Sequence, residues 1–242
     1  MPSKILSSNK IKILRFLKGK LSNIINLFLK IAFKINTKNY GVIISEAFYT
    51  PWNGDKKFTN YYNTFKKFTM LNDQRAYNIY KSINNIRYLR GDCVEIGCWK
   101  GGISFLISKK LKSINLNKTI HAFDTFKGVI KASKKDKNYS GGEHDEADIN
   151  EIKLCINKFN LKNIIVHKGI FPDDFQNEKF LNRICFAHID VDTYNSARDA
   201  TKFIWNKLVK GGIILFDDYG FHQTEGIKTF VNNFSKENKC SF

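Results

Sequence analysis

The first forty residues contain no acidic side chain, although they carry nine lysines and arginines. This basic segment accounts for half of the formal net charge of +18, so nucleic acid and an anionic membrane surface are both candidate partners. No run of about 18 uncharged apolar residues is present, which argues against a transmembrane helix. Lys18, Lys20, Lys30 and Lys34 interrupt the apolar residues of the segment, which argues against a secretory signal.

The sequence also lacks a CxxC pair and any Cys/His cluster with zinc spacing. Its five cysteines are dispersed, and several of them fall in apolar, strand-like runs. We expect buried, reduced thiols, which are typical of the cytoplasm. The predicted location is therefore cytoplasmic, with association to a membrane surface as the alternative. The cysteines are Cys93, Cys98, Cys155, Cys185 and Cys240.

Residues 11–35 have the periodicity of an amphipathic helix, with apolar residues in steps of three and four and basic residues beside them. Such a helix can lie on an anionic membrane surface. The alternative is a helix packed on the rest of the chain or on a second subunit of a homo-oligomer. The apolar positions are Leu14, Leu17, Leu21, Ile24, Phe28, Ile31 and Ile35.

From about residue 73 onward, short apolar runs alternate with helical patterns. This order predicts an α/β fold with a doubly wound, mostly parallel sheet, in which ligands bind beyond the carboxyl ends of the strands. The expected organisation is a basic helical arm over 1–40, a helical extension over 41–90 and a cofactor-binding domain over 91–242. Strands are expected at 93–97, 119–123, 163–167, 184–189 and 212–216, and helices at 73–87, 102–111, 148–160, 196–208 and 223–236.

The loop after the first expected strand, GDCVEIGCWKGGISF, is rich in glycine but matches neither the GxGxxG dinucleotide fingerprint nor a Walker loop. Gly97, Gly101 and Gly102 allow a sharp turn and close approach to a ligand. The spacing E-x-G-x-x-x-G is typical of S-adenosylmethionine (SAM) loops, where an acid such as Glu95 suits the cationic amino-acid part of SAM. A glycine turn without a ligand is the alternative.

The second expected strand ends in HAFDTF, which places Asp124 about 30 residues beyond the glycine loop. An acid at that strand end is positioned to accept hydrogen bonds from a ribose. The alternative is an acid that only caps a helix or a turn.

Two pairs of aspartates follow the fourth and fifth expected strands, Asp190 with Asp192 and Asp217 with Asp218. The two strands should be neighbours, so the carboxylates should converge and either raise one another's pKa or bind a cation. Oxygen ligands favour Mg²⁺. We predict Asp190, Asp217 and Asp218 as metal ligands and Asp192 as the base that deprotonates an alcohol acceptor. The alternative is that these acids cap the next helix or face solvent.

Together these segments resemble the macrocin O-methyltransferase family, Mg²⁺-dependent SAM enzymes that methylate deoxysugars of macrolide and aminocoumarin antibiotics. The resemblance implies the same metal ligands and the same base, and SAM contacts near Thr69 and Met70, at Glu95 and Gly97, and at Asp124 and Thr125. It also implies two further strands at the C-terminus, whereas the chain stops at KENKCSF, so we expect either a truncated sequence or a sheet that is completed otherwise. The segments that carry it are TML with Arg75, VEIGCWKGG, FDTFKG, HIDVDTYNS and GGIILFDDYG.

These patterns predict a SAM- and Mg²⁺-dependent O-methyltransferase acting on the hydroxyl of a nucleotide sugar, a glycan or a glycosylated metabolite. Two alternatives remain: a nucleic-acid methyltransferase, against which the missing NPPY-type motif and the repulsion of phosphate by the acids argue, and a non-catalytic scaffold at a membrane surface. No nucleic acid is expected as a partner. The polar loop GGEHDEAD, residues 141–148, is either a solvated loop or a lid that brings Glu143 and His144 to the substrate.

Overall fold

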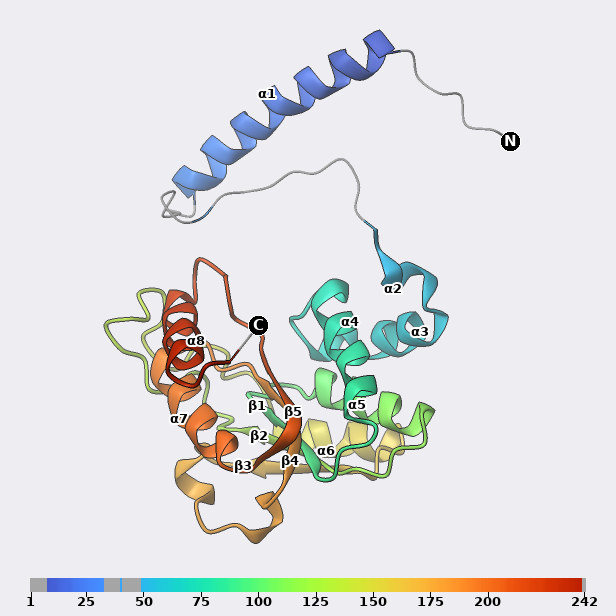
Figure 1. Cartoon of the computed structure of the whole chain (residues 1–242), viewed down its shortest axis with the longest axis vertical. Coiled ribbons are helices and arrows are strands. Elements are labelled where there is room, and N and C mark those ends of the chain that lie inside the picture. Colours follow the sequence, from blue (N-terminus) through green and yellow to red (C-terminus); the bar gives the residue numbers. More distant parts are fainter. Residues whose placement is uncertain (1–7, 33–39, 41–48, 241–242) are drawn as a thin grey trace. The chain divides into compact units, whose positions relative to one another are not determined.

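The structure is a computed structural model that describes residues 8–32, 40 and 49–240. It divides into two units, Met1–Tyr49 and Thr50–Phe242 (Figure 1). The predicted extension over 41–90 supplies the first helices of the second unit.

The described part of the first unit is helix α1, Ser8–Ala32. It contains six of the seven predicted apolar positions, whereas Ile35 lies outside the described residues. Its large apolar side chains are mostly exposed, for example Leu17 at 55% and Phe28 at 67%. No helix among the described residues has the length and apolar character needed to cross a membrane.

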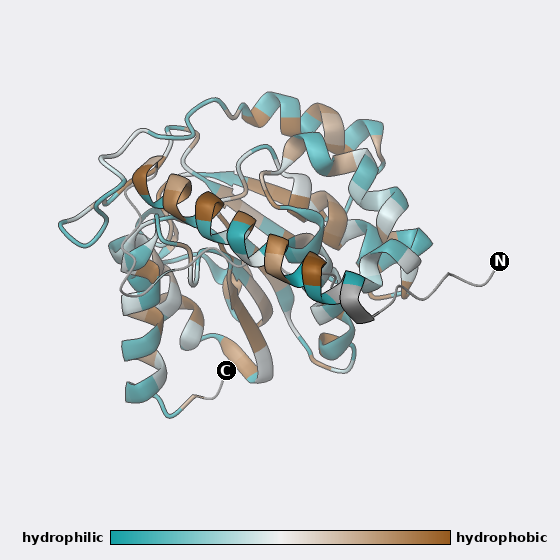
Figure 2. Ribbon diagram, turned by 90° about the horizontal axis from the view of Figure 1, so that it is seen from above, coloured by the Kyte–Doolittle hydropathy of each residue, from teal (hydrophilic) through white to brown (hydrophobic). Residues whose placement is uncertain are grey.

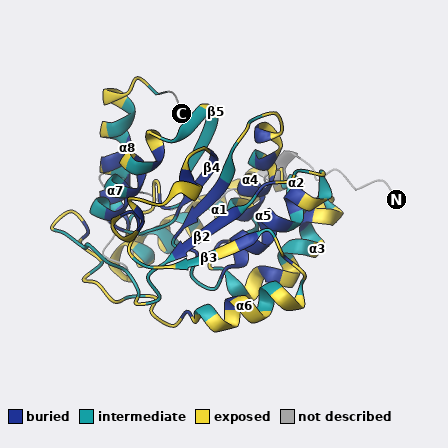
Figure 3. Ribbon diagram, turned by 90° about the horizontal axis from the view of Figure 1, so that it is seen from below, coloured by how far each residue is buried: buried dark blue, intermediate teal, exposed yellow. Residues whose placement is uncertain are grey.

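The second unit is built on a five-stranded parallel sheet with the order β3-β2-β1-β4-β5. This confirms the doubly wound α/β fold. Strands β1, β2 and β4 lie in the middle and are mostly buried, because helices cover both faces of the sheet (Figure 3). The strands are β1 Asp92–Ile96, β2 Ile120–Asp124, β3 Ile164–Lys168, β4 Ile184–Ile189 and β5 Leu208–Phe216.

Side chains that alternate along each strand serve two different cores. On β1, Cys93 packs with the helices that precede and follow that strand, whereas Val94 packs on the other face with Ala200 and Ile204 of α7. Helix α8 covers α7 through Ile227 and Phe230. The helices are α2 Pro51–Gly54, α3 Lys56–Phe65, α4 Asp73–Ser82, α5 Gly102–Ser113, α6 Ile149–Lys158, α7 Tyr194–Trp205 and α8 Glu225–Glu237, with short 3₁₀ turns at Lys66–Phe68, Ile83–Ile86, Asp173–Phe175 and Lys179–Leu181.

Three predicted boundaries differ from the structure by three residues or more. The helix expected at 196–208 ends at Trp205, and β5 begins at Leu208 rather than at residue 212. The helix expected at 73–87 ends as α4 at Ser82 and continues as a 3₁₀ turn to Ile86. Within the described residues, α8 follows β5 and no further strand comes after it.

Candidate active site

An open cavity with about 690 Å³ of empty space lies beyond the carboxyl ends of β1, β2 and β4. Ligands of open α/β sheets bind in this position, outside the carboxyl ends of the strands. Four of the predicted SAM-binding residues line this cavity: Met70, Gly97, Asp124 and Thr125. Asp190 and Asp192 line it as well. The other lining residues are Ile96, Trp99, Phe123, Gly128, Val129, Ile130, His144, Gly169, Phe171, Val191 and Ser196.

Asp124 ends β2 and holds the loop that follows β1. Its Oδ2 accepts a hydrogen bond from the backbone N–H of Trp99 at 2.8 Å, and its Oδ1 accepts one from Phe126 N–H at 2.8 Å. Burial raises the pKa of this carboxyl above its usual value, while these backbone donors oppose the rise. A carboxylate offers about four lone-pair sites, so Asp124 can still accept from a ligand hydroxyl.

The glycines of the loop after β1 allow the backbone of other segments to approach closely, because glycine has no Cβ. Gly97 has φ of +83°, and a Cβ there would overlap the carbonyl oxygen of Asp190. Gly102 begins α5, and a Cβ there would lie 2.6 Å from the carbonyl oxygen of Phe68. Gly101 and Gly102 therefore shape the turn but do not line the cavity, and Thr69 lies outside the lining as well.

Glu95 lies away from the cavity. Its side chain is 2% exposed and is engaged by the Oγ of Ser104 on α5 and, at 3.1 Å, by Nδ1 of His188 on β4. The side chain thus points toward α5 and β4, and its contact with SAM remains a prediction.

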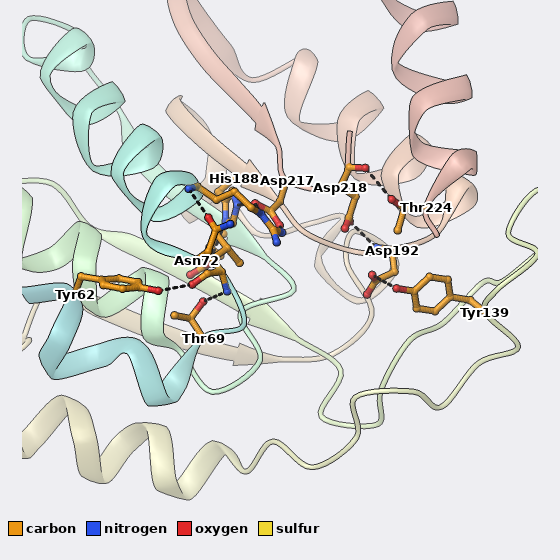
Figure 4. Close-up of polar contacts among 12 residues, drawn as sticks. Tyr62, Thr69, Asn72, Tyr139, His188, Asp192, Asp217, Asp218 and Thr224 are labelled. Carbon is orange, nitrogen blue, oxygen red and sulfur yellow. Dashed lines mark hydrogen bonds and ion pairs between the residues drawn. The ribbon is translucent and has the colours of Figure 1, made fainter. Parts of the chain in front are cut away.

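In Figure 4, Asp217 lies beside His188, whereas Asp218 lies beside Asp192. Ligand atoms of His188, Asp190 and Asp217 lie within 4.8 Å of one another. Asp218 points elsewhere: its Oδ2 accepts from the backbone N–H of Asp192 at 3.0 Å, and its carbonyl accepts from Thr224 Oγ1 at 2.8 Å. Consecutive residues at a strand end project to opposite faces, which separates Asp217 from Asp218. The role of Asp218 as a metal ligand remains a prediction.

Burial and neighbouring charges act on Asp190, Asp192 and Asp218. Burial first, and then the charges of Asp218 and Asp192, raise the pKa of Asp190 well above its usual value. Burial and the charge of Asp192 raise the pKa of Asp218 to about 7. Carboxylates in such surroundings either hold protons or bind a cation. The oxygen-rich donor set therefore fits a divalent ion.

A positively charged side chain, Arg75, contacts one of the aspartates of the site. Arg75 pairs with Asp217, with its Nε donating to Oδ1 at 3.1 Å. The guanidinium also lies 4.8 Å from the ring centroid of Phe221. Asn72 caps α4 by accepting from the backbone N–H of Arg75, which fixes this arginine in the first turn of the helix.

Asp192, the predicted base, stands at the wall of the cavity with a left-handed φ of +60°. Its Oδ1 accepts a hydrogen bond from the hydroxyl of Tyr139 at 2.6 Å. Sequence reasoning missed Tyr139, because it lies in a long polar loop without periodicity. The same loop brings His144 to the cavity, whereas Glu143 is outside the lining and accepts hydrogen bonds from the backbone N–H groups of Ser140 and Gly141. The lid over residues 141–148 remains a prediction.

Comparison with known proteins decides the family. The sequence profile of the macrocin-O-methyltransferase (TylF) family matches residues 47–241. The chain belongs to this family. It is 24% identical over 165 residues to demethyldecarbamoylnovobiocin O-methyltransferase of Streptomyces niveus, over 62% of each chain. It is 23% identical over 158 residues to 8-demethyl-8-(2,3-dimethoxy-alpha-L-rhamnosyl)-tetracenomycin-C 4'-O-methyltransferase of Streptomyces olivaceus, over 57% of this chain and 60% of the relative.

The fold is that of class I SAM methyltransferases. The structure of the O-methyltransferase NovP superposes with a TM-score of 0.63 and 21% identity, over 71% of this chain and 75% of NovP. The chain spans only 60% to 63% of the length of the curated relatives it matches.

Proposed function

We propose that this TylF-family chain is a SAM-dependent O-methyltransferase that uses a divalent cation, predicted to be Mg²⁺, and methylates the hydroxyl of a sugar. One observation carries the proposal. Gly97, in the loop after β1, and Asp124, at the end of β2, line the same cavity as Asp190 and Asp192. A methyl donor and a metal-held acceptor would therefore lie side by side.

The cavity fits the donor in both its polar and its apolar parts. Asp124 supplies an acceptor for ribose hydroxyls, and Ile96, Phe123 and Phe171 supply apolar wall for an adenine ring. The close approach of Gly97 to the backbone of Asp190 keeps the glycine loop beside the acids.

The acceptor would be activated by the acids. When bound, a divalent cation would lower the pKa of the acceptor hydroxyl and would hold two neighbouring hydroxyls of the acceptor in place. Asp190 and Asp217, with Asp218 as predicted, would hold this cation. Asp192 would take the proton of the reacting hydroxyl, and the Tyr139 hydroxyl on its Oδ1 leaves Oδ2 free to accept it.

The name of the Streptomyces olivaceus relative includes a rhamnosyl group, which supports a sugar as the acceptor class. A nucleotide sugar, a glycan and a glycosylated metabolite all offer the adjacent hydroxyls that this arrangement needs.

The proposal is tested by calorimetry and by transfer of a labelled methyl group. We expect the full chain to bind SAM, and to methylate a member of a panel of nucleotide sugars in the presence of Mg²⁺ but not after chelation. Asp124→Ala should weaken SAM binding by about 10-fold or more, because it removes a charged acceptor from the cavity. Absence of SAM binding would favour a scaffold, and methylation of RNA with salt-sensitive binding would favour the nucleic-acid alternative.

We further infer that α1 attaches the chain to an anionic membrane surface. Hydrophobic and hydrophilic residues alternate along the ribbon of α1 (Figure 2). Its exposed apolar positions include Leu17 and Phe28, and the sequence of the basic arm has no acid to repel an anionic lipid. Lys20 extends along the helix, with its Nζ 4.9 Å from the ring centroid of Phe16, as expected of a lysine whose stem covers apolar surface. Each basic residue near an anionic leaflet contributes about 1 kcal/mol to binding.

Flotation of the full chain with vesicles tests the attachment. We expect binding to phosphatidylcholine vesicles that also contain phosphatidylserine, and little binding to phosphatidylcholine alone. The double variant Leu17→Asp/Phe28→Asp should weaken binding by about 100-fold or more, because two large side chains leave the bilayer. Ser22→Asp/Asn26→Asp adds the same charge on the opposite side of α1 and is the matched control. Equal loss in both variants, or binding that ignores phosphatidylserine, would contradict the attachment.

A further inference from the structure

We propose that His188 is itself a ligand of the divalent cation, together with Asp190 and Asp217, and that Glu95 and Ser104 fix its ring for this role. The inference rests on the proposed function only for the presence of a cation, since the ligand set follows from the geometry. His188 lies on β4, is 0% exposed, and offers a ring nitrogen within 4.8 Å of ligand atoms of both aspartates.

The first argument is an unpartnered nitrogen. Within the part of the chain that the structure describes, Nε2 of His188 is buried and has no hydrogen-bond partner. The nearest acid oxygen, Oδ1 of Asp217, lies 3.8 Å away, which is too far for a hydrogen bond. Leaving a polar atom unsatisfied in the interior costs about 1–3 kcal/mol, and a cation between Nε2 and the carboxylates would remove this cost.

The second argument is the orientation of the ring. Nδ1 lies 3.1 Å from Oε1 of Glu95, and a carboxylate accepts, so Nδ1 carries the proton. In the neutral ring Nε2 then presents a lone pair toward Asp190 and Asp217. A carboxylate that holds the far nitrogen of a histidine is the usual support of a metal-binding imidazole.

The support is built into the sheet and its covering helix. Glu95 and His188 are direct partners in the parallel register of β1 and β4, so both side chains project from the same face. Glu95 in turn accepts from the Oγ of Ser104, which is 0% exposed on α5. This chain of buried contacts gives Glu95 a role at the metal rather than at SAM.

A nitrogen ligand changes the metal that the site prefers. Mg²⁺ is bound through oxygen atoms, whereas imidazole with carboxylates suits Mn²⁺ and later transition metals. A bound cation would share Asp217 with the guanidinium of Arg75, which contacts that carboxylate in the structure. We therefore expect this chain to bind Mn²⁺ more tightly than Mg²⁺.

Electron paramagnetic resonance of Mn²⁺ added to the full chain tests the ligand set without reference to activity. Electron spin-echo modulation should show a ¹⁴N coupling from a coordinated imidazole in the native chain. The coupling should disappear in His188→Gln, and it should survive in His121→Gln, which alters a buried histidine that contacts His167 on β3 instead. Glu95→Gln should retain the coupling but weaken Mn²⁺ binding by about 10- to 100-fold.

Three results would overturn the assignment: Mn²⁺ bound to the native chain without a ¹⁴N coupling, a coupling that persists in His188→Gln, or no Mn²⁺ binding at all. Should His188→Gln fail to fold, the spectrum of the native chain and the affinity of Glu95→Gln still decide. SAM binding and methyl transfer are measured separately on the same preparation. A ¹⁴N coupling without methyl transfer would therefore leave the ligand in place and count against the proposed function alone.

Discussion

Asp192→Asn should lower the rate of methyl transfer by about 10²- to 10⁴-fold while leaving SAM binding unchanged. The amide has the size of the carboxylate, and its oxygen can still accept from the hydroxyl of Tyr139. The backbone N–H of residue 192 that donates to Asp218 is also retained. The substitution removes the capacity to take a proton, together with the negative charge that acts on Asp190 and Asp218. The effect should therefore fall on kcat measured at saturating SAM, acceptor and Mg²⁺.

Asp145→Asn is the matched control for Asp192→Asn. It makes the same change of charge at an exposed position of the loop that follows β2, away from the lining of the cavity. Its kcat should equal that of the native chain. A rate for Asp192→Asn within a few-fold of the native rate, with a normal rate for Asp145→Asn, would show that another group takes the proton.

The sheet was predictable because each strand is short, apolar and followed by a helical pattern, and this order fixes the parallel topology. The start of β5 could not be predicted in this way. This strand pairs only with β4 among the described strands, and its first half includes the exposed Lys210 and the positive-φ Gly211. An edge position tolerates polar residues, so hydrophobic pattern alone places the beginning of the strand too late.

Within the site, the sequence located the acids but not their arrangement. Asp217 and Asp218 are adjacent in sequence, but strand alternation gives their side chains different partners, Arg75 for Asp217 and the backbone N–H of Asp192 for Asp218. The left-handed turn at Asp192 has no sequence signal of its own. The contact between His188 and Glu95 depends on the register between β1 and β4. Sequence patterns do not give this register, because it pairs residues that are far apart in the chain.

Gly97→Ala should lower the free energy of unfolding by about 2–5 kcal/mol and abolish SAM binding. An alanine at φ of +83° costs about 1–2 kcal/mol, and its Cβ would overlap the carbonyl oxygen of Asp190, which is backbone and cannot rotate away. The two strand ends would have to separate. Both residues line the cavity, so the same displacement would disturb the cofactor loop and the acids together.

Comparison with Gly142→Ala separates the steric part of this effect from the conformational part. Gly142 has a comparable φ of +92°, but a Cβ there would meet no heavy atom within 4 Å. Chemical denaturation should therefore show only the conformational cost of about 1–2 kcal/mol for Gly142→Ala, and calorimetry should show normal SAM binding. Equal losses of stability in the two variants would mean that β1 and β4 can part without strain, and the joint placement of methyl donor and acids would then need another cause.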